Sequence, residues 1–143
     1  MKISTKGRYA LRVMIDLAEH NGGAFIPLRD IAARQEISEK YLESIISVLV
    51  KDGILTGLRG KGGGYRLSQP AESITVARIL TLTEGNLAPV ACLDCPPNGC
   101  PRAAECKTLP MWTELNRLVN GYFEGITIAQ LAARETDAGN YVI

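Results

Sequence analysis

Residues 26–67 read IPLRDIAARQEISEKYLESIISVLVKDGILTGLRGKGGGYRL, and local signals divide this run into two helices and a hairpin. Pro27 suits the first turn of one helix, because its missing N–H needs no partner there, and Ser38 can cap a second helix. The chain turns between them around Gln35–Ile37, where Glu36 occupies a position that often holds glycine. Two short helices joined by a tight turn are typical of a helix-turn-helix, although a purely structural helix pair has the same pattern.

The second predicted helix has an apolar stripe and a polar face. Its inward residues recur at helical spacing, and they are Leu42, Ile45, Ile46 and Leu49. The opposite face is expected to contact DNA through Ser38, Glu39, Lys40, Tyr41, Glu43 and Ser44. Phosphate would repel Glu43, so we expect this side chain to accept a hydrogen bond from a cytosine amino group or to disfavour wrong sites.

A β-hairpin with a basic glycine loop is predicted directly after this helix, with strands over residues 54–58 and 65–67. The loop residues expected at DNA are Arg59, Gly60, Lys61 and Gly62. Because glycines let the backbone approach closely, we expect Arg59 to enter a minor groove and Lys61 to lie near phosphate. A helix-turn-helix followed by a cationic hairpin is a winged helix. The loop matches neither G-x-G-x-x-G nor a Walker loop, so nucleotide binding is not expected.

Further helices are predicted on both sides of this unit. Ser4 or Thr5 can cap a first helix, and Thr75 can cap a connecting helix that ends at Gly85. A wide apolar stripe after residue 110 predicts another helix of roughly fifteen residues. Its dimerisation residues are expected to be Trp112, Leu115, Leu118, Val119, Tyr122 and Phe123. So much large apolar surface in a small protein is expected to pack against a second copy, with packing onto its own domain as the alternative.

The chain after the long helix is expected to be short and simple. Thr127 and Gln130 form a capping box for a last helix that reaches Arg134. Residues 135–143 are expected to be a loose tail.

Every cysteine lies between Cys92 and Cys106, in a C-x2-C-x4-C-x5-C run broken by prolines and a glycine. Thiolates select zinc, copper(I) or iron–sulfur clusters, so the expected metal ligands are Cys92, Cys95, Cys100 and Cys106. The same thiols also suit tetrahedral structural zinc or a redox switch, and unrelated small buried cysteines are the plainest alternative. An enzyme that uses Cys92 and Cys95 for thiol–disulfide or electron-transfer chemistry is not expected, because no acid–base pair converges on them.

Length and charge agree with one small domain and an appended arm: the chain has 143 residues, of which 46% are hydrophobic. We expect a DNA-binding domain at 1–70, a connecting helix and sensor loop at 71–106, and a dimerisation region at 107–143. The first of these carries eleven Lys or Arg against seven Asp or Glu, while residues 71–143 carry five against eight. A basic first part suits a phosphate-bearing partner, although an ordinary solvated surface can have this charge.

Hydropathy gives no membrane-spanning run and no apolar signal-peptide core, so we expect a cytoplasmic protein without a membrane partner. In the cytoplasm thiols stay reduced, which favours a metal or redox role for clustered cysteines over structural disulfides.

Three motifs together resemble one bacterial repressor family. They are KISTKGRYA at residues 2–10, the run from Ile31-Ala32 to Tyr41-Leu42-Glu43, and RGKGGGY at residues 59–65. The family includes a regulator of iron–sulfur cluster assembly, a nitric-oxide-sensing repressor and a regulator of cysteine metabolism. The resemblance implies a winged helix-turn-helix homodimer that represses transcription from palindromic operators in double-stranded DNA, with the long helix as its dimer arm.

The sensing members of this family carry three cysteines before the dimer helix. Cys100 and Cys106 match that spacing, and either Cys92 or Cys95 can be the first. The fourth ligands of the relatives do not carry over, because a histidine position is Leu109 here and an aspartate position is Arg8.

We therefore expect the four cysteines to hold one iron–sulfur cluster per subunit, of the 2Fe–2S or 4Fe–4S type. No ligand is expected from the partner chain, and the cluster is expected to set operator affinity. Bound zinc, a thiol redox switch and a cluster-free regulator of cysteine metabolism are the alternatives. The opening nine residues resemble the cysteine-metabolism branch closely.

Overall fold

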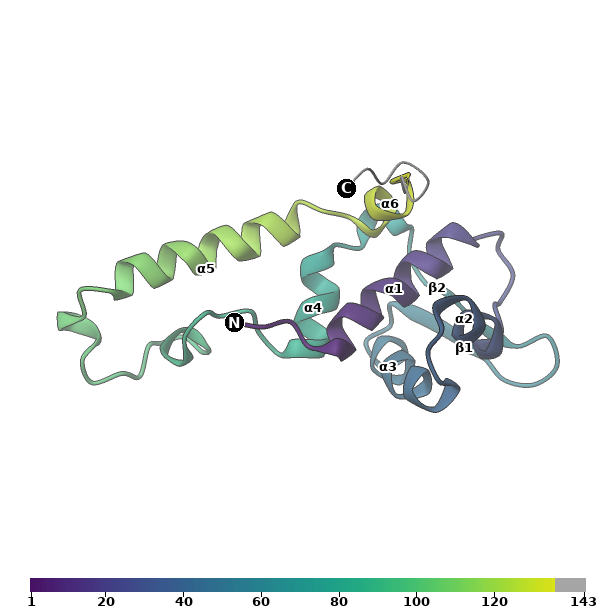
Figure 1. Cartoon of the computed structure of the whole chain (residues 1–143), viewed down its shortest axis with the longest axis horizontal. Helices are drawn as coiled ribbons and strands as arrows, with labels where there is room; N and C mark the ends of the chain where they lie inside the picture. Colours follow the sequence, from purple (N-terminus) through teal and green to yellow (C-terminus); the bar gives the residue numbers. More distant parts are fainter. Residues whose placement is uncertain (136–143) are drawn as a thin grey trace, which may run out of the picture.

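The computed structural model describes residues 1–135, so the predicted tail lies outside the described residues apart from Glu135. Along this part of the chain the structure has these helices and strands: α1 (Thr5–Glu19), α2 (Leu28–Gln35), α3 (Glu39–Lys51), β1 (Leu55–Leu58), β2 (Gly64–Leu67), α4 (Val76–Glu84), α5 (Leu109–Glu124) and α6 (Ile128–Ala132). The head contains all of them except α5, which projects as an arm (Figure 1). The predicted mainly helical winged helix-turn-helix is confirmed.

Helix α1 is the element around which the head is assembled. Its first turn is capped by Ser4, whose Oγ accepts a hydrogen bond from the Gly7 N–H at 3.1 Å. The apolar residues Ala10, Val13 and Met14 recur at helical spacing and are fully buried. Helix α1 packs against α2, α3, α4, α6 and β2, so most of the head touches this one helix.

The helix-turn-helix consists of α2 and α3, and the apolar stripe predicted for the second helix is buried as expected. Ser38 caps α3 by accepting a hydrogen bond from the Tyr41 N–H at 3.2 Å. Pro27 lies at the N-cap of α2, one residue before the predicted first turn. In the turn, Glu36 adopts the left-handed conformation with φ 54°, which costs a non-glycine residue about 1 kcal/mol.

The wing is an antiparallel hairpin in which Leu55 pairs with Leu67 and Leu58 with Gly64. A third segment joins it, because Ile26 and Tyr65 exchange two backbone hydrogen bonds of 2.8 Å. This pairing needs glycine at position 64, where a Cβ would lie 2.1 Å from the Ile26 carbonyl oxygen. The wing is therefore fixed to the chain just before α2.

The arm is attached to the head at its C-terminal end. Backbone hydrogen bonds of 2.9 Å run from the Val76 N–H to the Ile126 oxygen and from the Ile128 N–H to the Ile74 oxygen. Ile74 and Ile128 also belong to the same buried core as α1–α3. The division at residues 70 and 106 stays a proposal, and the apolar core itself crosses both boundaries.

One buried charge ties α1 to the helix-turn-helix. Asp16 is 1% exposed and accepts hydrogen bonds from Arg34 Nε at 2.9 Å, Arg34 Nη2 at 2.8 Å and Gln35 Nε2 at 2.9 Å. Burial alone would raise the pKa of Asp16, but the hydrogen bonds from Arg34 and Gln35 and the charge of Arg34 outweigh burial and lower it. The carboxylate is therefore ionised, and it holds the end of α2 against α1.

No helix among residues 1–135 is both long enough and apolar enough to cross a membrane.

Replacing Asp16 with Asn should lower the free energy of unfolding by about 2 kcal/mol at neutral pH. This loss is smaller than for a fully buried ion pair, because the Arg34 side chain is 36% exposed and water screens its charge. Since folding lowers the pKa of Asp16, its charge stabilises the protein above the unfolded-state pKa of about 3.9. That stabilisation is lost as the pH falls through the lower folded-state pKa. Urea denaturation from pH 7 to pH 3 should show the gap between wild type and variant closing below about pH 4.

The matched control is Glu114→Gln, which breaks the exposed pair of Glu114 and Arg117. This variant should unfold like the wild type at neutral pH. A gap for Asp16→Asn that stays constant over the whole pH range would contradict the assigned role of the buried charge.

Candidate DNA-binding surface and cysteine segment

The exposed face of α3 carries the predicted DNA contacts. Ser38, Glu39, Lys40, Glu43 and Ser44 are all exposed. The hydroxyl of Ser44 donates to the Tyr41 carbonyl oxygen at 2.7 Å, so this residue also has a local partner. The buried stripe on the opposite face of α3 holds the helix in place, so these polar side chains face outward.

Tyr41 differs from the other predicted contacts, because it is half-buried. Its ring lies edge-on to Tyr9 of α1, with centroids 5.8 Å apart and an interplanar angle of 70°. Such aromatic pairs stabilise a contact beyond the area that they bury. Tyr41 therefore helps to hold α3 on α1.

Arg12 belongs to the same junction and was not predicted from the sequence. Its guanidinium lies 5.0 Å from the centre of the Tyr9 ring. It also donates from Nε to Gln35 Oε1 at 3.1 Å and from Nη2 to the Gln35 carbonyl oxygen. The spacing of Tyr9 and Arg12 on one helix face could have indicated the stacking, but not the partner in the turn.

The wing tip is a glycine turn with two exposed cations, Arg59 and Lys61. Gly60 and Gly62 have φ values of 92° and 78°, which favour glycine. The turn closes with a 3.0 Å hydrogen bond from the Gly63 N–H to the Gly60 oxygen. Neither Arg59 nor Lys61 forms an ion pair within residues 1–135.

Two clefts flank the wing on the side of α3. One, of about 340 Å³, lies between the start of α2 and the wing tip and includes Arg29, Glu39 and Arg59. The other, of about 440 Å³, lies between α3 and the wing base and includes Glu43, Lys51 and Arg59. Arg29 was not predicted, and its side chain is 77% exposed. Arg29 and Arg59, in the cleft beside the wing tip, suit a phosphate group. Part of their charge is offset by the carboxylate of Glu39 in the same cleft and by Asp30, whose Oδ1 lies 3.9 Å from Arg29 Nε.

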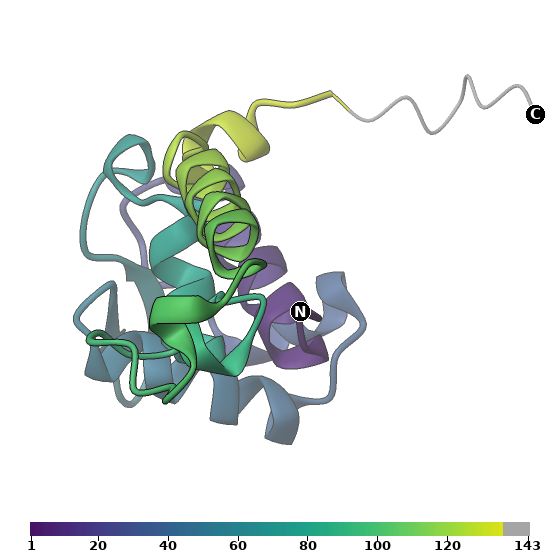
Figure 2. The same cartoon turned by 90° about the vertical axis from the view of Figure 1, so that its left-hand side faces the viewer.

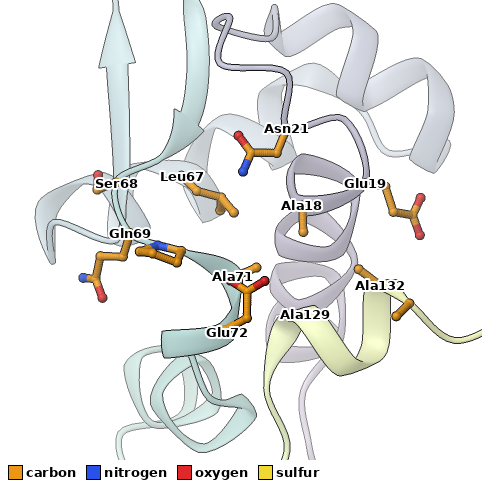
Figure 3. Close-up of a pocket in the computed structure, with 12 residues that line it drawn as sticks. Ala18, Glu19, Asn21, Leu67, Ser68, Gln69, Ala71, Glu72, Ala129 and Ala132 are labelled. Atoms are coloured by element: carbon orange, nitrogen blue, oxygen red, sulfur yellow. The ribbon is translucent and has the colours of Figure 1, made fainter.

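A third groove, of about 610 Å³, lies between the end of α1, the chain after β2, and α6 (Figure 3). Alanines form much of its lining, including Ala18 and Ala129. Among its described lining residues there are two carboxylates, Glu19 and Glu72, and no Lys or Arg. Its charge therefore does not suit a nucleic-acid backbone.

The cysteine segment runs from the end of α4 out to the start of α5 (Figures 1 and 2). Cys92 and Cys106 are half-buried, Cys95 and Cys100 are exposed, and all four are free thiols. Local turns shape the segment: the Asn98 side chain accepts from the Cys100 N–H at 2.9 Å, and the Cys100 oxygen from the Ala103 N–H at 3.1 Å.

The structure does not bring the predicted metal ligands together. Within residues 1–135 no group of three or more His, Cys, Asp and Glu side chains is arranged to hold a metal ion. The donor types suit a soft metal or an iron–sulfur cluster, but the arrangement of the thiols does not fit one. The segment would have to change conformation to gather four sulfur atoms.

Cys106 has the most distinctive environment of the four cysteines. Its sulfur lies 3.4 Å from Thr108 Oγ1, just before α5 begins. This hydroxyl, the backbone N–H groups of Thr108 and Leu109 and the charge of Arg102 lower the pKa of the Cys106 thiol, against a smaller opposing effect of desolvation. A thiolate at this position is stabilised by the start of a helix.

The arm exposes much of the predicted dimer surface. No residue of α5 is fully buried, and Leu118 and Tyr122 are 53% and 67% exposed. Val119 and Phe123 pack partly against the chain's own cluster of Val76, Leu80 and Leu87, so the alternative of packing within the domain accounts for part of the stripe. Trp112 and Leu115 are half-buried.

An apolar groove of about 320 Å³ runs along this face. Its lining is Met1, Ile3, Leu118, Val119, Tyr122 and Phe123. The N-terminal residues therefore share the exposed surface of the arm.

Known proteins resemble this chain over nearly all of its length. Residues 3–134 match the family described as Rrf2, iron-dependent transcriptional regulator. The HTH-type transcriptional regulator IscR of Serratia proteamaculans is 37% identical over 131 residues, which are 92% of this chain and 79% of that protein.

Solved structures of two regulators also superpose on this chain. CymR (YrzC), the global cysteine regulator of B. subtilis, superposes with a TM-score of 0.77 at 32% identity, covering 95% of this chain and 99% of that one. T. potens IscR superposes with a TM-score of 0.73 at 31% identity, covering 99% and 97%. These relatives are regulators and not enzymes, as was predicted for this chain. The chain belongs to the Rrf2 family of DNA-binding transcription regulators.

Proposed function

We propose that this protein is a dimeric repressor that binds a palindromic operator and whose affinity depends on the state of its cysteine segment. The proposal that the protein binds DNA rests mainly on the surface that α3 and the wing share. On it an exposed recognition face lies beside the clefts that contain Arg29, Arg59 and Lys51. A helix of this kind enters the major groove, while a narrow cationic tip suits the minor groove beside it.

The proposed dimer rests on the exposed stripe of α5. A soluble monomer rarely exposes a continuous patch of large apolar side chains. A second copy related by a two-fold axis would cover Leu118 and Tyr122 in both chains with one self-complementary contact. It would also set two recognition helices about one turn of DNA apart, or ~34 Å, as a palindrome requires.

The proposed sensor is the segment from Cys92 to Cys106. Four free thiols outside the core are available for a ligand, and the backbone hydrogen bonds of the segment join only residues close together in the chain. An iron–sulfur cluster suits this donor set once the segment has changed conformation. Cys100 and Cys106 are the ligands whose spacing matches the sensing relatives. Structural zinc and a thiol redox switch use the same residues. DNA and reduced thiols together fit the cytoplasm as the place of action.

Replacing Lys61 with Ala should weaken binding to all DNA sequences alike and reduce the slope of log affinity against log salt by about one. Replacing Arg59 with Ala should cost ~1–3 kcal/mol and depend on sequence, because a side chain in a groove senses the bases. Fluorescence anisotropy with a selected operator and a scrambled duplex measures both effects.

The matched control is Glu72→Ala, a charge change in the groove between α1, the chain after β2 and α6, which includes neither Arg59 nor Lys61. This variant should bind DNA like the wild type. Unchanged affinity of the Arg59 and Lys61 double variant at low salt would rule out the proposed surface.

Replacing Leu118 with Asp should convert the dimer into a monomer, because two charges would be buried at one contact. Sedimentation velocity at micromolar concentration measures the change, and Thr113→Asp on an exposed part of the same helix is the control. A monomeric wild type would contradict the dimer.

Single Cys→Ala variants, reconstituted without oxygen and assayed for iron, sulfide and visible absorption, test the sensor. Loss of the cluster is expected at Cys100 and Cys106, and at one or both of Cys92 and Cys95. Colourless protein with bound zinc would favour the structural site, since zinc has no d–d absorption. Retention of a cluster in Cys106→Ala would overturn the ligand assignment.

A further inference from the structure

Glu84 lies at the boundary between the DNA-binding head and the cysteine segment. It is the last residue of α4, and Gly85 ends that helix with φ 84°. Residues 85–91, which include the buried Leu87, connect α4 to the cysteine segment that begins at Cys92. The Glu84 side chain is half-buried and turns back toward the start of α1.

Both donors of Ser4 meet one oxygen of Glu84. The Ser4 hydroxyl donates to Oε1 at 2.6 Å, and the Ser4 backbone N–H donates to the same atom at 3.1 Å. The Ser4 hydroxyl oxygen in turn accepts from the Gly7 N–H at 3.1 Å. Glu84 therefore orients the hydroxyl that caps α1.

This arrangement is a capping box whose parts come from two helices. In the usual box, a Glu or Gln three residues after the cap bonds back to the backbone N–H of the cap. Here that position is Gly7, which has no side chain, and α1 has no acidic residue in its first turn. Glu84 makes the missing hydrogen bond from α4, and its negative charge faces the positive end of the α1 dipole.

Gly7 leaves the space into which the Glu84 carboxylate extends. A Cβ at position 7 would lie 2.3 Å from Glu84 Oε1 and 3.1 Å from Thr83 Oγ1. Glycine is a poor helix former, so its place in the first turn of α1 is explained by the carboxylate that it admits.

Beyond its cap, and in addition to its buried apolar face, α1 contacts the helix-turn-helix through three polar or aromatic side chains. Tyr9 contacts Tyr41, Arg12 contacts the turn at Gln35, and Asp16 binds both Arg34 and Gln35. These contacts connect the start of α1 to α3, and Tyr9, the first of them, lies five residues after Ser4.

We propose that Glu84 is a positioning residue that couples the cysteine segment to the recognition helix by capping α1 from α4. The proposal rests on the function proposed above. When a ligand draws the cysteine segment into a new shape, the end of α4 moves, the hydrogen bonds to Ser4 change, and α1 shifts against α2 and α3. A cap with a purely structural role would affect stability but not the response of DNA binding to the cysteine segment.

The test uses Zn²⁺ as a thiol-binding probe on the reduced full-length protein, so that it does not depend on an assembled cluster. Operator affinity is measured by anisotropy with and without Zn²⁺, and amide hydrogen exchange is followed over residues 5–8. In the wild type, Zn²⁺ should change operator affinity by about fivefold or more and should change exchange at these amides.

Three variants separate the roles of the carboxylate. Glu84→Ala should speed exchange at residues 5–8 by about fivefold or more and abolish the effect of Zn²⁺ on affinity. Glu84→Gln retains the acceptor oxygen and should restore most of that effect. Gly7→Ala should also abolish the effect, because its Cβ displaces Glu84 while its helix propensity supports α1, so this variant serves if Glu84→Ala folds poorly.

The outcomes distinguish this inference from the proposed function. If Zn²⁺ shifts operator affinity equally in wild type, Glu84→Ala and Gly7→Ala, the coupling role of Glu84 is overturned and the sensor function stands. If bound Zn²⁺ changes the affinity of none of them, the thiol-sensing function fails, and the coupling fails with it.

Discussion

The carboxylate of Asp16 is the interaction on which the DNA-binding head depends. It lies in the core with three hydrogen bonds from Arg34 and Gln35, and it joins the middle of α1 to the end of α2. A buried ion with satisfied partners tolerates few alternative arrangements, whereas apolar packing alone tolerates sliding. The angle between α1 and the helix-turn-helix is therefore specified by directional bonds, and the apolar residues around them supply most of the stabilisation.

Local signals in the sequence were sufficient to predict the head. The caps at Ser38 and Thr75 and the apolar stripe of α3 involve neighbours within a few turns, so a single sequence shows them. For the first helix the sequence offered Ser4 or Thr5, and Ser4 is the cap. The capping box of Thr127 and Gln130 is also present as predicted. Contacts between residues far apart in the sequence were not predicted, because nothing near Asp16 or Glu84 in the chain indicates which residues they contact.

The cysteine segment shows a different limit of sequence patterns. Spacing along the chain restricts where sulfur atoms can lie, but turns such as the one at Asn98 decide where they do lie. In residues 1–135 the thiols are not gathered, and the family relationship does not choose among a cluster, zinc and a redox switch. The arm presents a similar case, because the stripe on α5 was predictable, while the second copy proposed to cover it would be a separate molecule.

The central claim is that two copies of this head read one operator as a symmetric pair. Hydroxyl-radical footprinting of the wild-type protein on a selected operator tests it most directly. The account predicts a two-fold symmetric footprint whose half-site centres are ~34 Å apart, one turn of DNA. Protection of a single half-site, or uniform protection along the duplex, would contradict it.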